Sequence, residues 1–249
     1  MKRAERHRLK ENALAHTIAV AQEGLITRKG EIGSILLGVI VVAAIAAGIY
    51  AWQRQDNVRA EQLLADAMVV FNAPVVSATM NPENPGEVPA AATIGATGSY
   101  ASERAKLTDA LPRLQAAADA YPETEAGVTA RYLYASSLSN LGRHDEAIDA
   151  FRKVVDLAGN DSLYGRVALM GTADALTRAG QMEAAIDTWN ALASSTDEQL
   201  PKDAVLMELG KAYRASGNQE EASRVFARVV DEYPTSLYSA EAQAALEGS

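Results

Sequence analysis

One long stretch of the chain carries no charge. Residues Ile32 to Trp52 form a run of 21 residues without Asp, Glu, Lys, Arg or His. At about 1.5 Å rise per residue, a helix of this length spans roughly 31 Å, close to the thickness of a hydrocarbon core of about 30 Å. A single segment can cross a bilayer only as a helix, because a helix satisfies its own backbone polar groups. The run therefore predicts a transmembrane helix over residues 31–53.

The charges on either side of this run predict its orientation. Residues 1–31 hold seven Lys or Arg and four Asp or Glu, whereas the rest of the chain carries a net charge of −12. Tyr50 and Trp52 stand at the other end of the run, where aromatic side chains favour the headgroup region. The positive-inside rule then predicts a cytoplasmic N-terminus, with residues 53–249 on the opposite side.

Other interpretations of the apolar run remain open. A cleaved secretory signal is one of them, because residues 44–46 form an Ala-x-Ala triplet, and a buried core helix is another. A retained anchor is favoured because the run exceeds the 7–15 residues of a signal's apolar region. The spacings Ser34 to Gly38 and Ala44 to Gly48 suit helix–helix packing, although an ordinary lipid-facing helix has similar spacings.

The segments that flank the run differ in character. The basic tail, residues 1–30, has apolar residues at helical spacing that predict a short amphipathic helix over 5–23, either bound to anionic lipid or acting only as a topology signal. Residues 54–71 contain neither Gly nor Pro and predict a helix continuing from the membrane. Residues 72–99 hold four of the eight prolines and predict a flexible Pro/Gly/Ala-rich loop.

Three segments of the C-terminal half repeat one pattern, beginning at Leu133, Met170 and Glu208. In each, a glycine is followed five residues later by an alanine and four residues after that by an aromatic. Consecutive glycines lie 38 and 37 residues apart. The glycines are Gly142, Gly180 and Gly217, the alanines are Ala147, Ala185 and Ala222, and the aromatics are Phe151, Trp189 and Phe226.

Stacked helical hairpins account for these residue types. Glycine ends a first helix in a left-handed conformation, alanine permits close approach of the second helix, and the aromatic fills the space between one hairpin and the next. An isolated hairpin cannot bury its apolar stripe, so hairpins must stack. The sequence therefore predicts an all-α fold: a single transmembrane helix followed by an α-solenoid over residues 100–249. A half-repeat at 110–122 precedes the full repeats, with Pro112 expected to kink it, and Ser236–Leu246 is predicted to form a capping helix.

The repeated pattern resembles the tetratricopeptide repeat over residues 128–235. The family's small first-helix residue falls at Ala135, Ala173 and Gly210, and its terminal proline is present only in the third repeat, as Pro234. The spacing between repeats exceeds the family's roughly 34 residues, which implies longer loops.

The whole arrangement resembles the ancillary subunit family of the SecYEG translocon. The shared features are an LKEN-type tract at Leu9–Asn12, one membrane span, Tyr50, Trp52 and Gln55, and the repeats. The tract Tyr233–Leu246 is similar to repeats of outer-membrane assembly lipoproteins and cell-division coordinators. These resemblances imply a bacterial inner-membrane protein with a periplasmic repeat domain, acting as a scaffold or ancillary chaperone. Its expected partners are envelope proteins, including the Sec translocon or periplasmic chaperones, and the lipid bilayer. The alternative is a structural organiser of an envelope assembly acting through self-association.

In tetratricopeptide arrays the first helices of the hairpins line a concave face, and the resemblance implies a protein-binding face on this chain. Tyr and Met there suit adaptable apolar contacts and Arg suits carboxylates, with packing between helices as the alternative role. A carboxylate clamp is not expected, because it needs Lys where Tyr132 stands. The predicted docking face comprises Tyr132, Ser136, Asn140, Met170, Asp174, Arg178, Met207, Lys211 and Arg214.

Catalytic patterns are missing from the sequence. It contains no H-E-x-x-H, G-x-S-x-G, P-loop or G-x-G-x-x-G motif, and no cysteine. His144 falls in a predicted repeat turn, where a structural role is expected. The acidic net charge of −9 disfavours nucleic acid as a partner. We therefore expect a protein that is not an enzyme and binds no cofactor or metal.

Overall fold

The computed structural model describes residues 29–76, 98–196 and 199–248, and these residues form an all-α structure. The prediction of an all-α fold is confirmed. Within the described residues the only β pairing is an isolated bridge between Val75 and Tyr100. The helices of this part of the chain are α2 (Lys29–Phe71), α4 (Glu103–Ala120), α5 (Glu125–Asn140), α6 (His144–Ala158), α7 (Leu163–Arg178), α8 (Met182–Ser194), α9 (Lys202–Ala215), α10 (Gln219–Glu232) and α11 (Ser239–Glu247).

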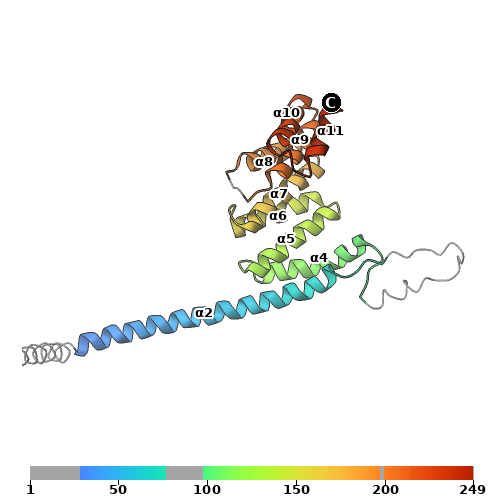
Figure 1. The fold of residues 1–249 in the computed structure, drawn as a ribbon. Helices are drawn as coiled ribbons and strands as arrows, with labels where there is room; N and C mark the ends of the chain where they lie inside the picture. The colour runs from blue at the N-terminus through green and yellow to red at the C-terminus, as the bar shows by residue number, and fades with distance from the viewer. Residues whose placement is uncertain (1–28, 77–97, 197–198, 249) are drawn as a thin grey trace, which may run out of the picture. The chain divides into compact units, whose positions relative to one another are not determined.

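Helix α2 is uninterrupted over 43 residues (Figure 1). The chain divides within it into two compact units, Met1–Gln55 and Asp56–Ser249. In the first unit the side chains from Leu37 onward are exposed, including Leu37 at 64% and Val42 at 66%. By length and composition α2 is able to cross a membrane, and none of its apolar window is buried in the protein.

The second unit begins with the end of α2, which packs on α4. Ala67 is fully buried together with Ala110 and Leu114 of α4. Leu64 packs against a second small cluster formed by α4 and α5. The segment after the membrane run thus supplies the helix that pairs with the half-repeat, and α4 runs without a break through Pro112.

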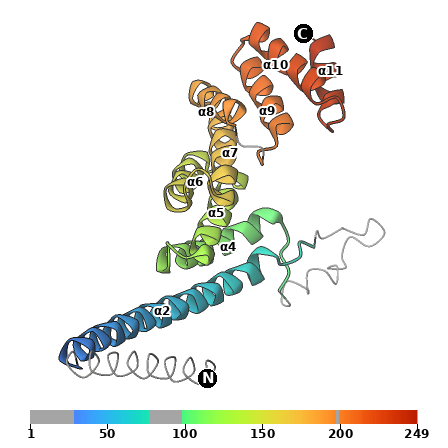
Figure 2. The ribbon, with the colours of Figure 1, turned by 60° about the vertical axis from the view of Figure 1, so that its left-hand side comes forward.

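Three helical hairpins follow, α5–α6, α7–α8 and α9–α10 (Figure 2). Each turns at a glycine with positive φ: 81° at Gly142, 76° at Gly180 and 83° at Gly217. These backbone conformations disfavour any residue with a Cβ. The alanines five residues later are at most 1% exposed, which lets the two helices of each hairpin approach closely.

The three repeat aromatics are all buried but differ in what they touch. Phe151 of α6 contacts the Tyr132 ring of its own hairpin, and a Cβ added to Gly171 of the next hairpin would lie only 2.6 Å from its ring. A Cβ added to Gly210, in the same hairpin as Phe226, would lie 2.5 Å from the Phe226 ring. The prediction that the aromatic joins neighbouring hairpins is confirmed for Phe151. Phe226 lies against the first helix of its own hairpin, which is the last hairpin of the array.

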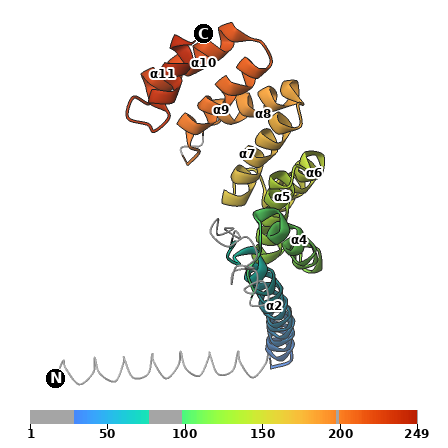
Figure 3. The ribbon, with the colours of Figure 1, turned by 90° about the vertical axis from the view of Figure 1, so that its right-hand side faces the viewer.

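Helix α11 ends the stack and packs on α10 (Figure 3). Its Ala242 is buried, and Tyr238 and Leu246 pack against the main core. The Ser236 hydroxyl before it donates to the Asp203 carboxylate at 2.7 Å, which ties this end to the start of α9.

Some sequence predictions lie outside the described residues. They are the amphipathic helix over 5–23 and positions 77–97 of the predicted loop. Where that loop starts and ends, Val76 N–H donates to the Tyr100 carbonyl at 2.9 Å and Tyr100 N–H donates to the Pro74 carbonyl at 3.0 Å.

Candidate functional site

The first helices of the hairpins lie side by side in the second unit. Helix α5 contacts α7, and α7 contacts α9, in addition to the contacts of each with its own second helix. This row of helices carries all nine residues of the predicted docking face. Contacts between first helices arise because each hairpin stacks on the previous one in the same orientation.

The α5 end of the docking face is built on aromatic rings. The centroid of the Tyr132 ring lies 5.7 Å from that of Phe151 and 6.2 Å from that of Tyr164 on α7. Tyr164 shares a hydrogen bond of 2.7 Å with Thr129, whose hydroxyl also donates to the Glu125 carbonyl. Burial, with a smaller contribution from Tyr164, raises the pKa of Tyr132, so its hydroxyl stays protonated at neutral pH.

The α7 part of the face mixes one apolar residue with an ion pair. Met170 is half-buried, and Asp174 accepts a hydrogen bond from Arg178 Nε at 2.8 Å one turn later. On α5, Ser136 is half-buried and Asn140 is exposed. The charges of α7 on this face therefore neutralise each other.

The α9 part differs from the expectation. Met207 is 1% exposed and belongs to the main core, so it is not available to a partner. Lys211 lies 2.9 Å from Glu208 and 3.1 Å from Glu241 of α11. Burial disfavours the charged form of Lys211, but the hydrogen bonds with the two glutamates outweigh this effect and its pKa is raised.

Arg214 is directed toward the second helix of its hairpin. Its guanidinium carbon lies 5.4 Å from the centroid of the Phe226 ring, a cation–π geometry. Thr177 stands at the equivalent position of α7, and its hydroxyl receives the Trp189 Nε1 hydrogen at 3.4 Å. In both hairpins this first-helix position therefore contacts the repeat aromatic.

Family comparisons identify the repeat type. Residues 96–162 and residues 204–236 each match a family model described as "Tetratricopeptide repeat". The chain contains tetratricopeptide repeats. The first match covers α4, α5 and α6, and the second covers α9 and α10. Helices α7 and α8 lie between the two matches and form the hairpin with the glycine turn at Gly180.

Solved structures with tetratricopeptide-like repeats are similar to this chain. A variant of a kinesin light chain candidate from Podosopora anserina, described as having nearly identical TPR-like repeats, shows 19% identity and a TM-score of 0.47, and the match covers 59% of this chain and 86% of that one. A MamA RS-1 double mutant shows 19% identity and a TM-score of 0.45, with 58% and 85% covered. No curated protein matches this chain. The resemblance to the SecYEG ancillary family has no counterpart in these comparisons and stays a prediction.

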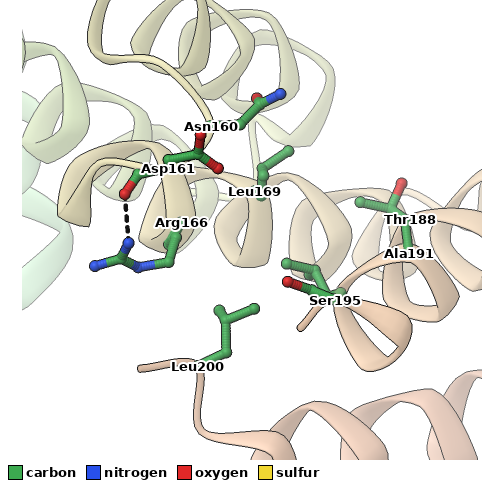
Figure 4. Close-up of a pocket in the computed structure, with 9 residues that line it drawn as sticks. Asn160, Asp161, Arg166, Leu169, Thr188, Ala191, Ser195 and Leu200 are labelled. Atoms are coloured by element: carbon green, nitrogen blue, oxygen red, sulfur yellow. Dashed lines mark hydrogen bonds between the residues drawn. The ribbon is translucent and has the colours of Figure 1, made fainter. Parts of the chain in front are cut away.

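A small cavity lies beside the loops that follow α6 and α8 (Figure 4). It has a volume of about 170 Å³. Leu169, Leu192 and Leu200 give it an apolar lining, and the side chains of Asn160, Asp161 and Ser195 reach it from the loops. Arg166 on its edge donates to the Asp161 carbonyl and to Gln199, so its guanidinium is held within the protein.

No metal site is found among the described residues. No three side chains of His, Cys, Asp or Glu in that part of the chain are grouped so that they could hold an ion. His144, in the first repeat turn, is half-buried and begins α6.

Sequence reasoning missed three residues beside the docking face. Tyr164 contacts the Tyr132 ring, and Glu208 and Glu241 hold Lys211. The contact of Glu208 with Lys211 could have been predicted from the sequence, because Glu208 lies one helical turn before Lys211. Glu241 was not, because only the packing of α11 brings it to α9.

Proposed function

We propose that this chain is a membrane-anchored protein-interaction protein. Its tetratricopeptide repeats would bind partner or client proteins through the docking face on α5, α7 and α9. The proposed setting is the bacterial inner membrane, with the repeat domain in the periplasm and a scaffolding or ancillary chaperone role at the Sec translocon. No covalent chemistry is part of this function.

One observation carries the proposal: tetratricopeptide repeats occur in the same chain as a helix able to cross a membrane. Repeats of this type provide extended surfaces for docking other proteins. An anchor would confine such a surface to one side of a bilayer and raise its effective concentration near partners in that membrane.

Membrane topology is tested first. A reporter active only outside the cytoplasm is fused after Ser249 in one fusion protein and before Met1 in a second. We expect activity only from the C-terminal fusion, because the basic residues precede the span. Activity from the N-terminal fusion alone, or release of both proteins from membranes by carbonate, would exclude the proposed arrangement.

Partner binding is tested by photo-crosslinking in cells. A photoreactive amino acid replaces Met170, which is half-buried on the docking face, and the control carries it at Glu183, an exposed residue on a second helix. We expect defined adducts from position 170 and not from 183. Purification from detergent-solubilised membranes, with a chain lacking residues 100–249 as control, identifies the partners and shows whether Sec components are among them.

Self-association is the second candidate function. It draws support from the spacing of Ala44 and Gly48, two small residues one helical turn apart on α2, where the backbone of a second helix can approach closely. The mass of the full chain in lipid nanodiscs separates the two candidates. A monomer supports client binding, whereas a dimer that Gly48→Ile disperses supports the structural role.

A further inference from the structure

The charged groups of the docking face are already engaged within the protein. Asp174 pairs with Arg178 at 2.8 Å, and Lys211 pairs with Glu208 at 2.9 Å and with Glu241 at 3.1 Å. A partner that offered a carboxylate or an ammonium group would have to displace one of these contacts. Such an exchange yields little free energy, because one ion pair replaces another.

Arg214 is a further charged residue of the docking face. It is exposed and has no carboxylate partner among the described residues. Its guanidinium is nevertheless seated on the Phe226 ring, on the side of the second helix. The acidic remainder of the chain, with a net charge of −12 after residue 31, opposes the approach of an acidic segment to it.

The α5 and α7 end of the face offers uncharged contacts instead. Tyr132 has a half-buried ring fixed between Phe151 and Tyr164, and its hydroxyl has no hydrogen-bond partner in the described part of the chain. Met170 on α7 is half-buried and can adapt its shape to an apolar side chain. Together they present one free hydroxyl donor and one apolar surface.

We infer that the docking face recognises uncharged, extended protein segments that place an aliphatic or aromatic side chain on Met170 and offer a backbone carbonyl to the Tyr132 hydroxyl. This inference rests on the proposed function and adds the chemical class of the partner. An extended segment fits because its backbone carbonyls are free to accept, whereas those of a folded helix or sheet are already bonded.

The test uses the full chain in lipid nanodiscs and a phage-displayed library of random 16-residue peptides. Selected peptides are synthesised and their affinities measured at low and high salt for the unaltered chain and for three variants. Tyr132→Phe removes the hydroxyl but keeps the ring, and Arg214→Gln removes the exposed cation. Tyr134→Phe is the matched control, because Tyr134 lies on the same helix and packs toward α2 and α4.

We expect the selected peptides to be poor in Asp, Glu, Lys and Arg. Their affinities at about 50 and about 500 mM NaCl should agree within about twofold, because this increase in salt screens exposed charge pairs but leaves uncharged contacts unchanged. Tyr132→Phe should weaken binding by about fivefold, the effect of one lost hydrogen bond. Tyr134→Phe should change affinity by less than twofold, and Arg214→Gln should weaken the binding of these uncharged peptides less than Tyr132→Phe does.

Three other results are distinguishable from one another. Charged peptides whose binding falls more than tenfold with salt, or falls with Arg214→Gln, would overturn this inference while leaving protein binding intact. A library from which nothing is enriched over empty nanodiscs would overturn both the inference and the proposed function. Selected peptides that bind Tyr132→Phe as tightly as the unaltered chain would refute the hydroxyl contact and with it the inference.

Discussion

Two glycines allow the backbone before a first helix to lie directly against the first turn of that helix. Gly127 near the start of α5 and Gly165 near the start of α7 occupy equivalent places, each donating its N–H to the cap hydroxyl of Thr124 or Ser162. A Cβ at Gly165 would lie 1.8 Å from the Gly159 carbonyl oxygen, and one at Gly127 would lie 1.9 Å from the Tyr121 carbonyl oxygen. The loop between two hairpins therefore closes directly over a glycine.

Replacing Gly165 by alanine should destabilise the second unit. The new Cβ would collide with backbone that has no rotamer to change, so we expect a loss of about 3 kcal/mol, at the upper end of overpacking costs. The control is Gly248→Ala, where the nearest atom lies at an ordinary 3.5 Å and the effect should stay below about 0.5 kcal/mol. Thermal unfolding followed by circular dichroism at 222 nm measures both, and equal melting temperatures would contradict the argument.

Lys211 provides a pH-dependent contact between α9 and α11. Its pKa is raised in the folded chain, so the stabilisation is fully present below its unfolded value of 10.5 and is lost as the pH rises through the folded pKa. We expect alkaline solution above pH 10.5 to lower the melting temperature more in the unaltered chain than in Lys211→Met. Parallel pH curves for the two proteins would show that the ion pairs of Lys211 with Glu208 and Glu241 contribute nothing to stability.

At the scale of elements, the sequence predicted the hairpins well and their contacts less well. The spacing of Gly142, Gly180 and Gly217 revealed the turns because a positive φ selects glycine wherever it occurs. The pairing of Lys211 with Glu241 could not be predicted in this way, since it depends on where α11 docks. The burial of Met207 could not be predicted either, since it depends on how the main core packs around α9. The same limit applies to Gly127 and Gly165, whose role depends on the path of the preceding loop.

Helix α4 contains a proline, Pro112, in its interior. Pro112 is exposed in the middle of α4 and cannot donate the hydrogen bond that position 112 would otherwise give to the Thr108 carbonyl. We expect Pro112→Ala to stabilise the second unit by about 1–3 kcal/mol, because it restores that bond and removes the clash of the ring with the preceding turn.

The matched control for this change is Pro201→Ala. Pro201 stands at the start of α9 with φ of −72°, where proline fits and lacks no helical bond. Its replacement should leave stability unchanged or lower it by about 1 kcal/mol through greater freedom of the unfolded chain. Urea titrations of both variants would contradict the prediction if Pro112→Ala proved the less stable of the two.

At the scale of the whole second unit, stability should follow from contacts between neighbours. Each hairpin of a solenoid contacts only the next, so the loss of one interface separates the array into parts. Phe151 contacts both its own hairpin and Gly171 of the next, whereas Phe226 is seated on Gly210 within its own hairpin. The two aromatics occupy the same place in the repeat. Because their contacts differ, their loss should destabilise different helices.

Hydrogen exchange in the full chain can measure which helices each substitution destabilises. Either Phe→Ala change should cost about 3–5 kcal/mol where the ring is lost, because it leaves a large cavity. We expect Phe151→Ala to raise amide exchange in α5, α6 and α7, on both sides of the lost contact, and to leave α10 and α11 protected. Phe226→Ala should raise exchange in α9, α10 and α11 and leave α5 and α6 unchanged. If both variants instead exchanged uniformly from α4 to α11, the second unit would be opening as one cooperative body, and the nearest-neighbour description of the repeats would be wrong.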